Sequence, residues 1–241
     1  MFVMRRVAFG GIFLVSLATF AAVQAAEPQQ PTQSAQSTGN FAPPHCVTAS
    51  NISYPINTSV SGLVTFSVSL DEVGHIANVQ TLRDVPPLTQ AALVALNTWS
   101  FAPAMLNGDG VPSTINVDIL FNPGNAAFGN PPPLAPDEPG TSQNGPYTPP
   151  RISSAAYADY PITTMLEGAV VFDVQVSRSG AARKVTSVFT TPSLVKTATS
   201  AVKKWRFSPG QYQGKPARSN AVVAFVFRSP TITTPYGSQT K

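Results

Sequence analysis

Residues 99–103 read WSFAP, and residues 205–209, which lie 106 positions later, read WRFSP. The match extends outward from this motif without a gap. Between residues 54–121 and 160–227, 21 of 68 positions are identical, and the lead-in Pro43–Pro44 also recurs as Pro149–Pro150. Self-similarity at a fixed spacing indicates that one structural unit occurs more than once. The sequence therefore predicts two copies of one module.

Each copy shows the same order of hydrophobic periodicities. Residues 62–70 (GLVTFSVSL) alternate apolar and polar side chains as a half-buried strand does, and 75–83 form the returning strand after a turn at Gly74. Apolar residues then recur at helical spacing over 88–99, and a last alternating strand ends at Phe121. The fold class predicted is α+β: two copies of a small module, each with a three-stranded antiparallel sheet packed on one helix.

Composition sets the predicted boundaries. The segment between the copies is rich in Pro, Gly, Asn and Ser, cannot bury a core, and would let the modules move independently. The predicted organisation is a signal peptide at 1–25, a disordered linker at 26–42, module 1 at 43–123, a Pro-rich linker at 124–148, module 2 at 149–230 and a disordered tail at 231–241.

The first residues have the character of an export signal. Arg5 and Arg6 precede an uncharged, mostly apolar run over 7–23, and small residues follow at Ala25 and Ala26. We expect cleavage here and a periplasmic protein. The alternative is an uncleaved anchor that holds the chain at the inner membrane facing the periplasm, although the run is shorter than the ~20 residues of a spanning helix. Contact with a membrane is expected only in that alternative.

Composition also argues against catalysis. A single Cys, Cys46, excludes a disulfide framework and any multi-Cys metal site. His45 and His75 have no nucleophile motif beside them, and Gly-rich phosphate loops are absent. The pair Asp71–Glu72 falls in a turn, where solvation is the simpler explanation. We therefore expect no catalytic residue, no metal and no cofactor, with an envelope hydrolase as a third class of function.

The two copies differ in charge. Residues 46–123 contain one basic and five acidic side chains, a net charge of −4, whereas residues 151–230 contain eleven basic and three acidic side chains, a net charge of +8. A basic module in the periplasm would attract peptidoglycan carboxylates, lipid phosphates or an acidic receptor segment. The alternatives are an ordinary solvated basic face and docking of one module on the other, while the export signal argues against nucleic acid. The residues expected to bind an anionic surface are Lys196, Lys203, Lys204, Arg206, Lys215 and Arg218.

The pattern as a whole resembles the C-terminal domain of TonB, which transmits inner-membrane energy to outer-membrane transporters. It is carried best in the second copy by Tyr160–Pro161, Gly180, Trp205–Pro209 (WRFSP) and Gly214–Pro216 (GKP). The resemblance implies that a short extended segment of an outer-membrane transporter adds itself beside the last strand of the module. The residues expected at this edge and its flank are Tyr160, Pro161, Ser219, Asn220, Ala221, Val222, Val223, Ala224, Phe225, Val226 and Phe227.

That last strand is apolar on both faces in the second copy, and Val222, Ala224 and Val226 form a second face that needs cover. The tail, the first module or a partner chain could supply it. The family's N-terminal membrane helix with a His, its long spacer and its Gln-Pro before Tyr-Pro are all missing here. We therefore expect a non-enzymatic periplasmic binding protein that engages outer-membrane transporters, other envelope proteins or the cell wall. The alternative is an energy transducer that supports transmembrane transport from an uncleaved anchor.

Overall fold

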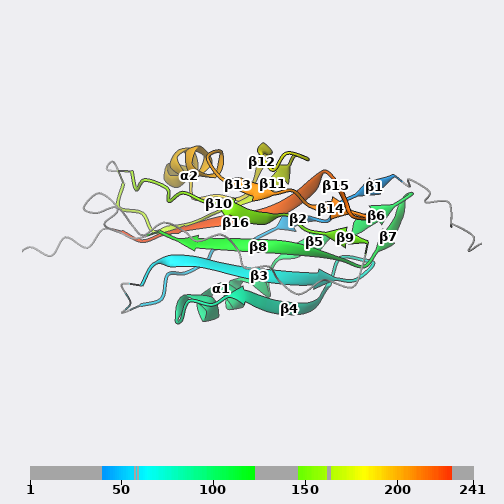
Figure 1. Cartoon of the computed structure of the whole chain (residues 1–241). Coiled ribbons are helices and arrows are strands. Elements are labelled where there is room, and N and C mark those ends of the chain that lie inside the picture. The colour runs from blue at the N-terminus through cyan, green and yellow to red at the C-terminus, as the bar shows by residue number, and fades with distance from the viewer. Residues whose placement is uncertain (1–39, 57, 59, 123–145, 162–163, 230–241) are drawn as a thin grey trace, which may run out of the picture. The chain divides into compact units, whose positions relative to one another are not determined.

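The computed structural model describes residues 40–56, 58, 60–122, 146–161 and 164–229. The predicted signal peptide, the predicted tail and most of both predicted linkers lie outside these residues. The described chain is mostly β-sheet and has two short α-helices, α1 and α2 (Figure 1). None of the helices in these residues is long and apolar enough to cross a membrane.

The first module supplies eight strands and one helix. These are β1 (Phe41–Ala42), β2 (His45–Thr48), β3 (Gly62–Leu70), β4 (Ile76–Arg83), α1 (Leu88–Leu96), β5 (Ser100–Ala102), β6 (Ala104–Leu106), β7 (Asp109–Val111) and β8 (Ser113–Phe121). Three of them, β3, β4 and β8, belong to the main sheet, and the others form small sheets at its margins.

The second module repeats this order. Its elements are β9 (Tyr147–Thr148), β10 (Arg151–Ser154), β11 (Gly168–Val176), β12 (Ala182–Phe189), the 3-10 helix η2 (Pro192–Leu194), α2 (Val195–Val202), β13 (Arg206–Ser208), β14 (Gln211–Tyr212), β15 (Lys215–Pro216) and β16 (Ser219–Phe227). The strands of the main sheet are β11, β12 and β16.

The two three-stranded sheets join into a single sheet of six strands, in the order β12-β11-β16-β8-β3-β4. Within each module neighbouring strands are antiparallel, but at the junction β16 runs parallel to β8 over five register pairs, from Val222 beside Val117 to Val226 beside Phe121. The expected independent movement of two separate modules is therefore wrong for the described structure. The arrangement of two self-contained α+β copies is not confirmed.

Each face of the joined sheet carries one helix, so the sheet has two hydrophobic cores (Figure 1). The core under α1 contains Leu88 and Phe66 of the first module together with Val222, Ala224 and Val226 of the second. The core under α2 contains Trp205 and Phe225 of the second module together with Leu63 and Leu120 of the first. The first module is thus what covers the second apolar face of β16, one of the three covers expected from the sequence.

The lead-in of each module also crosses to the other one. The Asn220 side chain donates a hydrogen bond to the carbonyl oxygen of Pro44 (3.1 Å), and Asn116 donates to that of Pro150 (2.9 Å). The residues at the ends of the predicted linkers are ordered in these crossings. Phe41–Ala42 form β1 and Tyr147–Thr148 form β9.

Glycine is required at the hairpin turns of the main sheet. Gly180 has φ +80°, and a Cβ there would lie 1.9 Å from the carbonyl oxygen of Phe207. Gly74 is its counterpart in the first module, with φ +92°, and a Cβ there would lie 2.3 Å from the carbonyl oxygen of Phe101. A side chain would therefore be both strained and obstructed at these positions. The hairpin turns are fixed against the strand that follows each helix.

Candidate partner-binding surfaces

The strand expected to offer a free edge lies in the middle of the sheet. β16 pairs with β11 on one side and with β8 on the other, and all nine of its residues, Ser219–Phe227, are buried. The expectation of an exposed edge at 219–227 is therefore wrong, because the sheet of the first module occupies it. Binding of a partner by these residues stays a prediction, and it would require the five pairs between β16 and β8 to separate.

Tyr160, expected beside that edge, has a structural contact that its counterpart Tyr54 repeats. The Tyr160 hydroxyl donates to the carbonyl oxygen of Leu166 (3.1 Å), and the Tyr54 hydroxyl donates to that of Val60 (2.6 Å). Each ring also lies near the Phe that ends the last strand of its module. The ring centroids are 6.3 Å apart for Tyr160 and Phe227 and 5.3 Å apart for Tyr54 and Phe121. Tyr160 and Pro161 remain half-exposed, so partner contact at this flank is sterically open.

Two other strands of the main sheet do have a free edge. β4 pairs only with β3, and β12 pairs only with β11, among the strands that the structure describes. The two edges differ chemically. The eight residues of β4 (IANVQTLR) carry a single charge, Arg83 at the end, whereas β12 (ARKVTSVF) carries Arg183 and Lys184 near its start.

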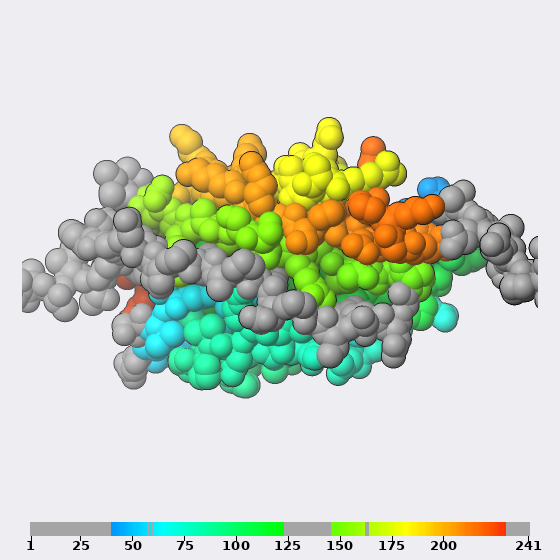
Figure 2. Space-filling model, in the orientation of Figure 1, coloured from blue at the N-terminus to red at the C-terminus, as the bar shows by residue number. Residues whose placement is uncertain are grey.

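A cleft of about 800 Å³ lies at the end of the sheet where β11 turns into β12. Its lining includes Ala42, Pro43 and His45 from the lead-in of the first module, and Gln175 and Asn220 from β11 and β16. Basic side chains surround it: Arg178, Arg183, Lys184 and Arg218. Figure 2 shows the β11–β12 hairpin, in yellow, standing out on the surface of the molecule. The cleft is therefore built from both modules.

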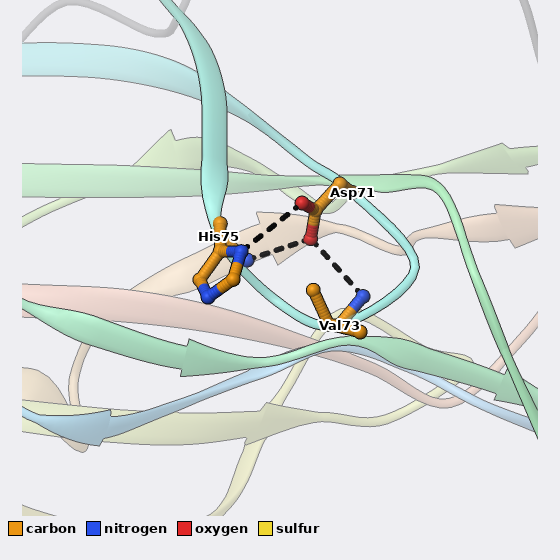
Figure 3. A network of polar contacts seen from close by, with 3 residues as sticks. All are labelled: Asp71, Val73 and His75. Atoms are coloured by element: carbon orange, nitrogen blue, oxygen red, sulfur yellow. Dashed lines mark hydrogen bonds and ion pairs between the residues drawn. The ribbon is translucent and has the colours of Figure 1, made fainter.

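The equivalent hairpin of the first module is acidic. Asp71 accepts hydrogen bonds from the backbone N–H groups of Val73 (3.0 Å) and His75 (2.8 Å), and its second carboxylate oxygen lies 3.3 Å from His75 Nδ1 (Figure 3). Slight burial raises the pKa of Asp71, but these hydrogen bonds outweigh it and lower that pKa. The His75 side chain is 82% exposed, as expected for a turn residue. The network closes the turn and explains Asp71 without a catalytic role.

In the second module Ser177 takes the place of Asp71. Its hydroxyl oxygen accepts from the N–H groups of Ser179 (3.3 Å) and Ala181 (3.0 Å), so the turn is closed in the same way without a negative charge. Arg178 follows where the first module has Glu72. The same backbone turn thus presents two acidic residues in one module and one basic residue in the other.

The six residues expected to bind an anionic surface come from several elements of the second module. Lys196 is exposed on α2, Lys203 and Lys204 directly follow that helix, and Lys215 is in β15. Arg206 donates to the carbonyl oxygens of Lys203, Lys204 and Trp205, the last at 2.9 Å, so it holds the turn that follows α2. Only Arg218 lines the basic cleft. The sequence showed the charge excess, but the site prediction omitted Arg178, Arg183 and Lys184, although these residues flank one turn.

A buried acidic residue lies near the cleft. Asp173 is 8% exposed and accepts a hydrogen bond from the backbone N–H of Cys46 at 3.3 Å. Burial raises the pKa of Asp173, while the Cys46 N–H and the positive charges of His45 and Lys184 oppose that rise. Burial, and to a lesser extent the Asp173 charge, raise the pKa of Cys46 to about 12. The thiol is therefore a buried, unreactive group.

Among the described residues, no group of three or more His, Cys, Asp or Glu side chains could hold a metal ion. The remaining features are those of a binding module: a sheet with two free edges, one of them almost uncharged, and a basic cleft at one end.

A comparison with protein families identifies this kind of module. The family model described as the Gram-negative bacterial TonB protein C-terminal matches residues 52–123 and 155–229, more than half of the chain. The chain therefore belongs to the TonB C-terminal domain family. No curated protein matched the sequence. The family is known as a family of non-enzymatic energy transducers of the cell envelope, and it generally interacts with outer-membrane transporters.

Proposed function

We propose that this protein is a non-enzymatic binding protein of the periplasm that takes up an extended segment of an outer-membrane transporter by strand addition. The observation that carries the proposal is the free edge of β4. This edge lies on the six-stranded sheet of the chain, and the chain belongs to a family whose members generally interact with outer-membrane transporters.

The chemistry of β4 favours pairing with another chain. A strand at the edge of a sheet offers a row of unpaired N–H and C=O groups, and natural proteins commonly guard such edges with Lys, Pro or other charged residues. β4 has no Pro, and its exposed residues Ala77, Asn78, Gln80 and Thr81 are uncharged. β12 carries Arg183 and Lys184, so it is the guarded edge of the two. An eight-residue unguarded edge is long enough for a typical added strand.

Strand addition at β4 differs from the site that the resemblance implied. In a single family module the last strand would be the edge, and here that strand, β16, is already paired with β8 of the other module. The joining of the modules therefore covers the edges of β8 and β16 and leaves β4 and β12 as the outer strands of the described sheet. The alternative role, an energy transducer held by an uncleaved N-terminal anchor, depends on residues 1–39, which lie outside the described structure.

The proposal is tested by titrating the purified protein with N-terminal peptides of outer-membrane transporters and following backbone amide signals by NMR. We expect the largest shifts over 76–83 and new protection from hydrogen exchange at alternate amides of β4. The matched control is the same peptide with alternate backbone nitrogens methylated. One methylation register removes the N–H groups that pair with β4 and should abolish binding, while the other register should retain it.

Two results would contradict the proposal. Shifts that cluster on 219–227 would mean that the modules separate and that β16 is the binding strand. Binding that is equally strong with both methylated peptides would mean that backbone pairing is not used.

A further inference from the structure

We propose that the basic cleft beside the β11–β12 hairpin is a second binding site, and that its ligand is an acidic peptide segment. This inference does not rest on strand addition, because the cleft belongs to the other end of the sheet order and uses side chains rather than a strand edge. The residues that matter for binding are the cations Arg178, Arg183, Lys184 and Arg218 and the amides Gln175 and Asn220.

The cations of the cleft form no ion pair within the described chain. No salt bridge joins Arg178, Arg183, Lys184 or Arg218 to an acidic side chain among the described residues. The lining contains no Asp or Glu. The nearest acidic group that acts on Lys184 and His45 is Asp173, which is buried. Four cations gathered around one concave surface repel one another, and an anionic ligand would relieve this repulsion.

The first module provides an internal comparison. The positions equivalent to Arg178, Arg183, Lys184 and Arg218 are occupied there by Glu72, Ala77, Asn78 and Pro112. The strands and the α-helix follow the same order in both modules, and each module has a crossing lead-in, held by Asn220 or Asn116. The fold therefore does not require basic residues at these positions. A fold requirement cannot account for the basic cleft, whereas an anionic ligand can.

The form of the cleft favours a peptide over the other anions of the envelope. A volume of about 800 Å³ falls within the range of roughly 300–1,000 Å³ typical of sites for discrete ligands. A lipid surface is instead bound by an exposed helix with an apolar face next to its cations. The lining has no Phe, Tyr or Trp ring on which a base could stack. It pairs Arg side chains, which bind carboxylates through two parallel hydrogen bonds, with amide and hydroxyl groups that suit peptide N–H and C=O.

The test measures the affinity of the purified protein for the peptide acetyl-ETETET-amide at low salt, by fluorescence anisotropy of a labelled copy. The peptide acetyl-QTQTQT-amide is the neutral control. We expect the acidic peptide to bind and the neutral peptide not to bind. The affinity for the acidic peptide should fall at least about tenfold when the salt concentration is raised from about 0.02 M to about 0.3 M.

Variants can be matched to residues that the first module already carries. Arg183→Ala with Lys184→Asn removes two charges from the cleft, and Lys196→Gln with Lys203→Asn removes two charges from the region of α2. We expect the cleft variant to weaken binding about tenfold or more and the α2 variant to weaken it less than about twofold. Asp173→Asn, which removes the negative charge near the cleft, should strengthen binding severalfold. The fluorine NMR signals of 5-fluorotryptophan at Trp99 and Trp205 report that each variant is folded.

Several outcomes would overturn the proposal. Equal losses in the cleft and α2 variants would mean that only net charge matters. Equal binding of the neutral peptide would remove the role of the cations. Binding of phosphatidylglycerol vesicles or inorganic phosphate without binding of the acidic peptide would assign the cleft to another class of anion. None of these outcomes bears on peptide pairing at β4, so the two proposals fail separately.

Discussion

The joined sheet predicts that the two modules unfold as one cooperative unit. The perturbation is Val226→Ala. Val226 is on β16 in the second module, is fully buried, and packs in the core under α1, beside Phe121 of the first module. If the modules form one unit, removing this side chain must lower the stability of the first module as much as that of the second.

The size of the effect follows from the burial of Val226. The substitution removes two methyl groups, each worth about 0.8 kcal/mol of transfer free energy. A residual cavity of roughly 50 Å³ adds about 1 kcal/mol at ~24 cal/mol per Å³. We therefore expect a loss of about 2–3 kcal/mol in the free energy of unfolding. For a domain of this size that corresponds to a fall in Tm of roughly 5–10 °C.

The chain offers one natural reporter in each module, because its two Trp residues are Trp99 and Trp205. Labelling with 5-fluorotryptophan gives one fluorine NMR signal per module, and urea unfolding is followed at both. We expect coincident transitions that shift together in Val226→Ala. Val94→Ala, at a side chain that is 61% exposed on α1, is the control and should change stability by less than about 0.5 kcal/mol. Two separate transitions, with the Trp99 signal unmoved, would refute the reasoning.

Three further predictions concern single residues. Gly214→Ala, at φ +73° with open space around it, should lower the free energy of unfolding by about 1–2 kcal/mol. Gly180→Ala should lower it by more than about 3 kcal/mol, because the new Cβ meets the Phe207 carbonyl. Chemical denaturation compares the two variants, and equal losses of stability would contradict the geometry. Cys46, with its pKa raised to about 12, should react with a thiol reagent at pH 8 roughly 10³-fold more slowly than a free thiol, and fast labelling of the native protein would contradict this. The free energy of unfolding should also fall as the pH rises from about 9 toward 12, because the thiol of the unfolded chain releases its proton at a lower pH than that of the folded chain. Burial raises the pKa of Asp173, so the folded state disfavours its ionised form, and Asp173→Asn should be at least as stable as the parent at neutral pH. As the pH falls through the raised pKa, the stability of the parent should rise relative to that of the variant. Thermal unfolding at several pH values tests the sign of this change.

Much of the secondary structure could be predicted from the sequence, because the signals that define it are local. The alternation in 62–70 and the apolar spacing over 88–99 predicted β3 and the region of α1, and the repeat carried both to β11 and α2. The junction between modules could not be predicted in the same way. The two apolar faces of β16 showed that cover was needed, but the pairing of Val222 with Val117 joins residues 105 positions apart across a segment with no periodicity.

The candidate sites show the same division. The charge difference between the modules was visible in the sequence, and it indicated a basic region in the second module. Its concentration in one cleft depends on the fold, because the lead-in of the first module crosses to the second module and lines the same cleft as Arg183 and Arg218. The edge at 219–227 was predicted by treating each module alone, and the partner module occupies it.

Hydrogen exchange of the backbone amides of β16, followed by NMR, tests the joined sheet most directly. Along a strand, successive N–H groups point to opposite neighbours, so a strand paired on one side protects only every second amide. Because β16 lies between β11 and β8, we predict slow exchange at consecutive amides through the doubly paired residues 222–226. Slow and fast amides alternating through 222–226 would show that the edge facing β8 is free, and would contradict the six-stranded sheet.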